Sequence, residues 1–151
     1  MIETPTHLLR LWRDAVALKG DRQWALAAQL YERILAAQPD WEHGYGYFHL
    51  AQCYEEIGSF HDASSAYQRA VLSMPSDPIL RGGFASFLYL HGDPNYAFEQ
   101  YICLLGLDKK RGDNDGAAAS ITALISLGSR LGWSEEETKS QIEKAILESS
   151  S

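Results

Sequence analysis

Apolar residues recur at intervals of three and four along almost the whole chain, rather than at every second position. Such spacing places apolar side chains on one face of an α-helix. Proline, Gly-Asp and Gly-Ser interrupt the pattern at regular intervals, and these residues are typical of turns. The pattern therefore predicts a series of amphipathic helices separated by turns, which is an all-α fold.

The residues at and around these interruptions recur along the sequence. Gly58 and Gly92 lie 34 residues apart, and so do Tyr67 and Tyr101. The preceding interval, from Tyr31 to Tyr67, is 36 residues. Self-similarity at a period of about 20 to 50 residues is typical of proteins built from stacked repeats. The sequence therefore predicts a repeat architecture.

The stretch from 43 to 76 carries the most complete copy of the repeat. Aromatic, leucine and small residues occur at matched spacings in its two helices: Tyr47, Leu50, Ala51 and Tyr54 in the first, and Ala63, Tyr67 and Ala70 in the second. The alanines allow the two helices to approach closely. Gly58 supplies the left-handed conformation between them, and Pro75 stops the second helix. This stretch resembles the tetratricopeptide repeat (TPR), a helix–turn–helix unit of about 34 residues.

Two flanking copies follow the same pattern less completely. The first, at about 6–40, keeps the spacing of its second helix in Trp24, Ala27, Tyr31, Ile34 and Pro39. The third, at about 77–110, opens with Asp77 as an N-cap and Pro78 at the first helical position, which together form a helix start signal. Pro94 occupies the same kind of position at the start of its second helix.

Beyond Leu107 the repeat pattern fades. The polar, glycine-rich stretch "DKKRGDNDG" (108–116) predicts a loop. Two more helices follow within about 113–149, and Ser134 with Glu137 forms a capping box at the start of the last one. We interpret this pair as a degenerate repeat that caps the array. The resemblance implies a single TPR domain over 1–151, an α-α superhelix of about eight helices in antiparallel pairs.

Composition and charge narrow the function. The chain of 151 residues is 46% hydrophobic and 22% charged, which is ordinary for one globular domain. Its net charge of −7 argues against nucleic acid as a partner. No signal peptide and no membrane-spanning stretch is expected. Two cysteines without a Cys-x-x-Cys motif fit a reducing compartment, and we expect a cytoplasmic protein.

Candidate chemistry is concentrated between 42 and 60, yet it does not form a catalytic pattern. His49 and Cys53 share a helix face, but a zinc site requires three or four ligands. Cys53 and Cys103 are both expected to pack in helix interiors. No phosphate-binding loop, nucleophile motif or metalloprotease motif occurs. The sequence therefore predicts no enzyme, no metal and no cofactor.

A binding surface is the remaining candidate. In the TPR proteins that this chain resembles, the first helices of successive repeats line a concave groove that receives a peptide or a partner's helix. By register, the groove residues here are Tyr45, Phe48, His49, Gln52, Glu55, Ile79, Ser86 and Tyr89. Tyr45 and Phe48 are large apolar residues outside the packing positions of the repeat, which makes them candidate anchors. The open alternative is that they pack against a terminal segment or a second protomer.

The resemblance predicts a non-catalytic interaction module, an adaptor or scaffold, that binds a protein or peptide and neither nucleic acid nor a membrane. Two alternatives stay open: a small secretion-type TPR chaperone, and a homodimer without a separate ligand. TPR domains that bind the acidic C-terminal tails of heat-shock chaperones use a clamp of Lys, Asn and Arg. The matching positions here read His49, Gln52, Ile79 and Gly83, so such a tail is not expected as the ligand.

Overall fold

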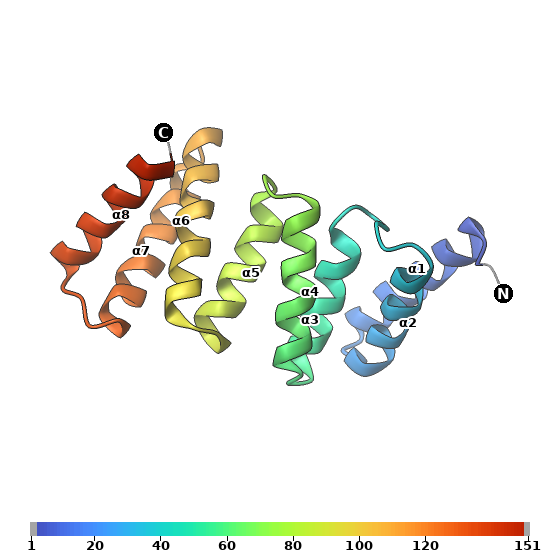
Figure 1. The fold of residues 1–151 in the computed structure, drawn as a ribbon. Helices are drawn as coiled ribbons and strands as arrows, with labels where there is room; N and C mark the ends of the chain where they lie inside the picture. The colour runs from blue at the N-terminus through green and yellow to red at the C-terminus, as the bar shows by residue number, and fades with distance from the viewer. Residues whose placement is uncertain (1–2, 150–151) are drawn as a thin grey trace. The chain divides into compact units, whose positions relative to one another are not determined.

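The computed structural model describes residues 3–149, which form eight α-helices and no β-strand (Figure 1). The all-α class and the number of helices are as predicted. The helix bounds are α1 Pro5–Gly20, α2 Trp24–Ala37, α3 Tyr45–Glu56, α4 Phe60–Ser73, α5 Pro78–His91, α6 Pro94–Arg111, α7 Asn114–Arg130 and α8 Glu135–Ser149.

The chain divides into two compact units, each made of two successive helix pairs. Unit 1 ends at Pro75 and contains α1 to α4, whereas unit 2 begins at Ser76 and contains α5 to α8. Within each unit every helix packs against the next one along the chain, and in unit 2 α6 also contacts α8. Packing between sequence neighbours is the organisation of a helical repeat. The grouping of all helices into one domain stays a prediction.

Small and aromatic residues build the core of unit 1. Ala27, Ala51 and Ala63, which the repeat spacing places at helix contacts, are fully buried. Tyr31 of α2 is also fully buried, and the tryptophan at position 12 packs against the same cluster. Alanine allows close approach of the helix backbones, and the aromatic rings fill the space around each contact. The repeat spacing therefore predicted the burial of the three alanines and of Tyr31.

The helix ends follow the predicted capping chemistry. Gly58 has a φ of +81°, in the left-handed region that favours glycine. The Asp77 carboxylate accepts hydrogen bonds from the backbone N–H groups of Ile79, at 2.8 Å, and Leu80, at 3.2 Å. The Ser134 hydroxyl accepts one from the N–H of Glu137 at 3.1 Å. These three local predictions are confirmed.

We expect Asp77→Ala to lower the unfolding free energy by about 1 kcal/mol, because two N–H groups at the start of α5 lose their acceptor. For a chain of this size that corresponds to a fall of roughly 2–4 °C in the melting temperature. Thermal unfolding followed by circular dichroism measures it. Ser76→Ala, one residue earlier at an exposed position, is the matched control, and equal melting temperatures in the two variants would contradict the assignment.

The prediction of a loop over residues 108–116 is wrong. Helix α6 continues to Arg111 and α7 begins at Asn114, so only Gly112 and Asp113 connect them. Gly112 adopts a left-handed φ of +74° and ends α6, while the Asp113 side chain accepts a hydrogen bond from the Gly116 N–H at 2.9 Å and starts α7. The charged residues before Gly112 stay helical because three basic side chains in the last turn favour the C-terminal end of the helix dipole.

Candidate partner-binding site

The predicted anchors Tyr45 and Phe48 begin the candidate surface on α3. Their ring centroids are 5.9 Å apart in an edge-to-face arrangement, and the Phe48 ring meets Tyr67 of α4 at 6.0 Å. Both anchor residues are half-buried. Packing within unit 1 therefore covers part of each ring and leaves the rest accessible.

His49, one residue further along α3, lies in an aromatic environment built from three helices. The Tyr31 ring of α2 stacks on it with a centroid distance of 5.8 Å and an interplanar angle of 12°. The Trp12 ring of α1 approaches it edge-on at 5.4 Å, and Phe48 lies at 5.9 Å. The imidazole of His49 therefore lies between the fully buried ring of Tyr31 and the half-buried ring of Phe48.

Lys19, in the last turn of α1, is the residue of this surface that sequence reasoning missed. Its Nζ lies 2.7 Å from Nδ1 of His49 and donates a second hydrogen bond to Oε1 of Gln52. Lys19 is half-buried, as are both of its partners. No sequence spacing links side chains 30 positions apart, so only the packing of unit 1 reveals this contact.

Burial determines the protonation states of this cluster. Burial and, second, the Lys19 charge lower the pKa of His49 to about 4, so the imidazole is neutral at neutral pH. Its Nδ1 accepts from Lys19, which places the ring proton on Nε2. Burial also lowers the pKa of Lys19 and raises that of the Cys53 thiol to about 11. A buried, protonated thiol is a poor nucleophile, and Cys53 is the small buried residue that was predicted.

Glu55 ends the surface on the side away from Tyr45. One of its carboxylate oxygens accepts a hydrogen bond from the Tyr67 hydroxyl at 2.8 Å, and Glu55 is half-buried. The surface is therefore aromatic in its middle and polar at Gln52 and Glu55. We call it the α3 face, defined by Lys19, Tyr45, Phe48, His49, Gln52 and Glu55.

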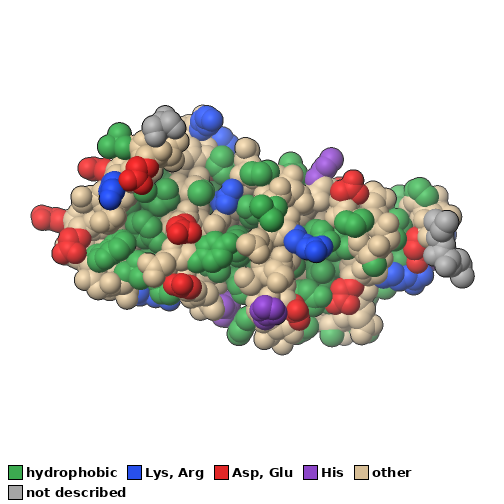
Figure 2. All heavy atoms as spheres, in the orientation of Figure 1, with side chains coloured by type: hydrophobic (Ala, Val, Ile, Leu, Met, Phe, Trp, Pro, Cys, Tyr) green, Lys and Arg blue, Asp and Glu red, His purple; other side chains and the backbone are tan. Residues whose placement is uncertain are grey.

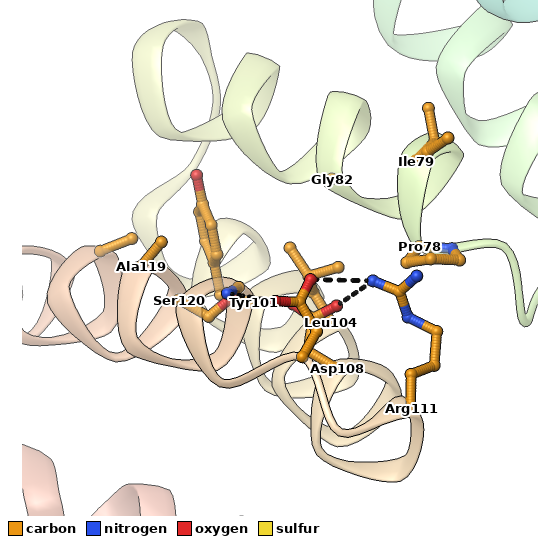
Figure 3. A pocket seen from close by; sticks show the side chains of 12 residues that line it. Pro78, Ile79, Gly82, Tyr101, Leu104, Asp108, Arg111, Ala119 and Ser120 are labelled. Carbon is orange, nitrogen blue, oxygen red and sulfur yellow. Dashed lines mark hydrogen bonds and ion pairs between the residues drawn. The ribbon is translucent and has the colours of Figure 1, made fainter.

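The predicted residues of the third copy lie in unit 2, where a cavity of about 350 Å³ opens among α5, α6 and α7 (Figure 3). Ile79, whose side chain is among the exposed apolar ones at 61%, lines it from α5. The opposite wall was missed by sequence reasoning. It consists of small residues of α7 at intervals of three and four, a pattern that could have indicated it: Gly116, Ala119, Ser120 and Ala123.

One end of this cavity is charged. The Arg111 guanidinium lies 3.0 Å from a carboxylate oxygen of Asp108 and 3.0 Å from one of Asp113, as the dashed lines in Figure 3 show. Asp108 is buried, whereas Arg111 is exposed. Two carboxylates and one guanidinium leave this end with a net negative charge.

Tyr89 and Ser86 occupy different surroundings on α5. The Tyr89 hydroxyl is 2.7 Å from Oγ of Ser126 on α7, its ring lies 6.3 Å from that of Tyr101, and the Arg130 guanidinium covers the ring at 5.4 Å. Tyr89 is therefore held by α6 and α7, while Ser86 is exposed. Neither lines the 350 Å³ cavity of Figure 3.

A larger hollow of about 830 Å³ lies between α6 and α8. Apolar residues including Ile102 and Leu107 line it, with Lys109 and Lys110 at the C-terminal end of α6. Figure 2 shows hydrophobic side chains reaching the surface over these helices. The expectation that Cys103 is packed is wrong, because its side chain lines this hollow and is exposed.

Within residues 3–149, no three side chains of His, Cys, Asp or Glu converge as the ligands of a metal ion would. In the same range, none of the helices combines the length and apolar character needed to cross a membrane. What the structure presents is partly accessible aromatic rings with polar neighbours in unit 1, and several hollows in unit 2.

The order of the helices and their pairing define an all-α helical-repeat protein. Solved structures of TPR-like proteins have the same fold. A putative kinesin light chain of Podosopora anserina with nearly identical TPR-like repeats matches with a TM-score of 0.73 and 18% identity, covering 99% of this chain and 79% of that one. The chain thus has the TPR-like fold that its repeats predicted.

Two other solved structures are similar over most of their length. PcrH from Pseudomonas aeruginosa matches with a TM-score of 0.68 and 16% identity, covering 82% of this chain and 93% of that one. A chain of a T3SS complex from Aeromonas hydrophila matches with a TM-score of 0.74 and 14% identity, covering 85% of each chain. No protein-family model matches the sequence, and no curated protein sequence does either.

Proposed function

We propose that this protein is a non-catalytic interaction module, an adaptor or scaffold, whose α3 face binds a peptide or a helix of a partner protein. The observation that carries the proposal is the α3 face itself. Tyr45 and Phe48 are large rings that their own unit covers only in part. Aromatic side chains with polar neighbours are the usual anchors of protein–protein contacts. The α5 residues Ile79, Ser86 and Tyr89 are proposed as a second contact surface.

The TPR-like fold supports the same function. Helical-repeat proteins present extended surfaces whose side chains can differ without changing the scaffold, and partner helices or peptides commonly bind in such surfaces. The net charge of −7 supports a protein partner rather than nucleic acid. We propose a cytoplasmic location and no membrane partner.

A second candidate is a small secretion-type chaperone. It is supported by the likeness to PcrH and to a chain of a T3SS complex, both similar over at least 82% of this chain. A chaperone and an adaptor differ in whether the partner stays soluble when it is produced without this chain. Co-expression separates them, because a chaperone's partner precipitates when this chain is omitted, whereas an adaptor's partner stays in solution.

Site-specific photo-crosslinking tests the α3 face. With a photoreactive phenylalanine in place of Tyr45, in cells that naturally produce the protein, we expect one discrete crosslinked partner. The same replacement of Phe60, an exposed aromatic residue of α4 in the same unit, is the matched control and should give no such product. Tyr45→Ala should weaken binding of the captured partner about tenfold, as for a binding anchor.

Three results would contradict the proposal. The first is equal crosslinking from the Tyr45 and Phe60 positions, and the second is unchanged affinity after Tyr45→Ala. The third is a crosslinked product with twice the mass of this chain, which would instead support the homodimer alternative.

A further inference from the structure

Lys19 is a half-buried cation without an acidic partner among residues 3–149. Its ammonium group donates to the neutral His49 ring and to the neutral amide of Gln52. The chain contains 20 Asp and Glu residues, yet none of those described supplies a carboxylate to this group. Charged side chains that leave water are normally paired with an opposite charge, so this arrangement lacks its usual counter-ion.

The hydrogen-bonding capacity of the cluster is only partly used. An ammonium group has three N–H donors, and His49 and Gln52 take two of them. The third is left for a group from outside the described chain. Because Nδ1 of His49 accepts from Lys19, the Nε2–H of the same ring is another donor. Both of these unused groups are N–H donors, and one belongs to a cation, so together they are suited to an acceptor with negative charge.

The surroundings favour such an acceptor when it is brought in by a polypeptide. Rings of Trp12 and Phe48 flank His49 at 5.4 and 5.9 Å, and apolar side chains of a partner would cover these rings and exclude water. Charge-assisted hydrogen bonds become stronger as water leaves their surroundings. On the α3 face, the Lys19 ammonium group contacts His49, and His49 contacts the Phe48 ring. A partner carboxylate next to an apolar side chain therefore fits this face, with the carboxylate at Lys19 and the apolar side chain at Phe48.

We propose that Lys19 binds a carboxylate of the partner segment on the α3 face, and that this segment carries Asp or Glu beside an apolar residue that contacts Phe48 and Tyr45. This inference rests on the proposed function and specifies the chemistry of its ligand. The carboxylate could belong to a side chain or to the C-terminus of a chain. The absence of a multi-residue clamp for acidic tails favours a side chain.

The test uses an array of peptides of about twelve residues, acetylated and amidated at their ends, probed with the full chain. We expect the bound peptides to share an Asp or Glu next to an apolar residue. In calorimetry, replacement of that acid by its amide should weaken binding by the wild type at least tenfold. Lys19→Met should bind the acidic and amide peptides equally, whereas Lys19→Arg should still prefer the acidic one. Lys139→Met, at an exposed lysine of α8, is the control and should behave as the wild type.

A second peptide set with free C-termini separates the two sources of the carboxylate. Binding that requires a free C-terminus, and that Lys19→Met abolishes, would support the anchor but assign it to the end of a chain. Bound peptides without an acidic preference would overturn the inference while leaving the proposed function intact, as would an acidic preference that survives in Lys19→Met. Failure of the wild type to bind any peptide would instead count against the proposed function, and the inference would fall with it.

Discussion

Gly128→Ala is expected to destabilise the protein by about 2 kcal/mol, although alanine is normally the better helix former. Gly128 is buried in α7, and a Cβ there would lie 2.0 Å from Oγ1, 2.6 Å from Cγ2 and 2.8 Å from Cβ of Thr138 on α8. Thr138 is fully buried and has a stiff, β-branched side chain. The helices must therefore separate, and overpacking of this kind costs roughly 1–3 kcal/mol or more.

Gly82→Ala is the matched control for this substitution. Gly82 also lies inside a helix of unit 2, but a Cβ there would meet only Cδ2 of Leu104, at an ordinary 3.7 Å. This variant should be as stable as the wild type or more stable, by up to about 1 kcal/mol. Melting temperatures from circular dichroism measure both effects, with Gly128→Ala lower by roughly 4–8 °C. A melting temperature for Gly128→Ala at or above that of Gly82→Ala would refute the close contact of α7 and α8.

Acid should destabilise unit 1 through His49. The folded pKa of His49 is about 4, below the value of about 6.5 for an exposed histidine. Between these two pH values the unfolded chain binds the proton and the folded chain does not, so the unfolding free energy falls as the pH is lowered from about 6.5 to 4. The full difference corresponds to about 3.5 kcal/mol as an upper bound, since each pKa unit is worth about 1.4 kcal/mol.

The comparison of two histidine variants isolates this contribution from those of the carboxylates. His49→Gln keeps an acceptor for Lys19 but cannot titrate, so its unfolding free energy should depend less on pH between 4 and 6.5 than that of the wild type. His61→Gln, at an exposed position of α4 in the same unit, should keep the wild-type dependence. Urea unfolding at a series of pH values provides the measurement, and identical pH dependence in the wild type and His49→Gln would show that His49 is not held in its neutral form.

Much of the fold could be read from the sequence because its causes are local. The fully buried Ala51 and Ala63 follow from repeat spacing, and the caps at Asp77 and Ser134 follow from the preference of their side chains for helix starts. The loop expected at 108–116 failed for an equally local reason. Polar composition alone does not distinguish a loop from an exposed helix end, and Gly112 with Asp113 was enough to connect α6 and α7.

The sequence predicted only part of the candidate site. Register along α3 selected Tyr45, Phe48 and His49 as candidates for the partner-binding face, and the structure places all three in one half-buried aromatic arrangement. Lys19 was not predicted, because its role depends on a contact between α1 and α3. That a partner binds to these side chains stays a prediction. In unit 2, Ile79 lines the cavity, whereas Tyr89 is held by Ser126 and Arg130.

The sequence by itself determined most helix starts and ends, though not the end of α6, and which helix faces are apolar, since capping, glycine conformation and helical spacing act over a few residues. Only the tertiary structure decided which side chains from different helices are buried in contact with one another. Lys19 meets His49, and Gly128 meets Thr138, because helix packing brings them into contact. Burial and close approach depend on that packing. They lower the pKa of His49 and require a glycine at position 128 of α7.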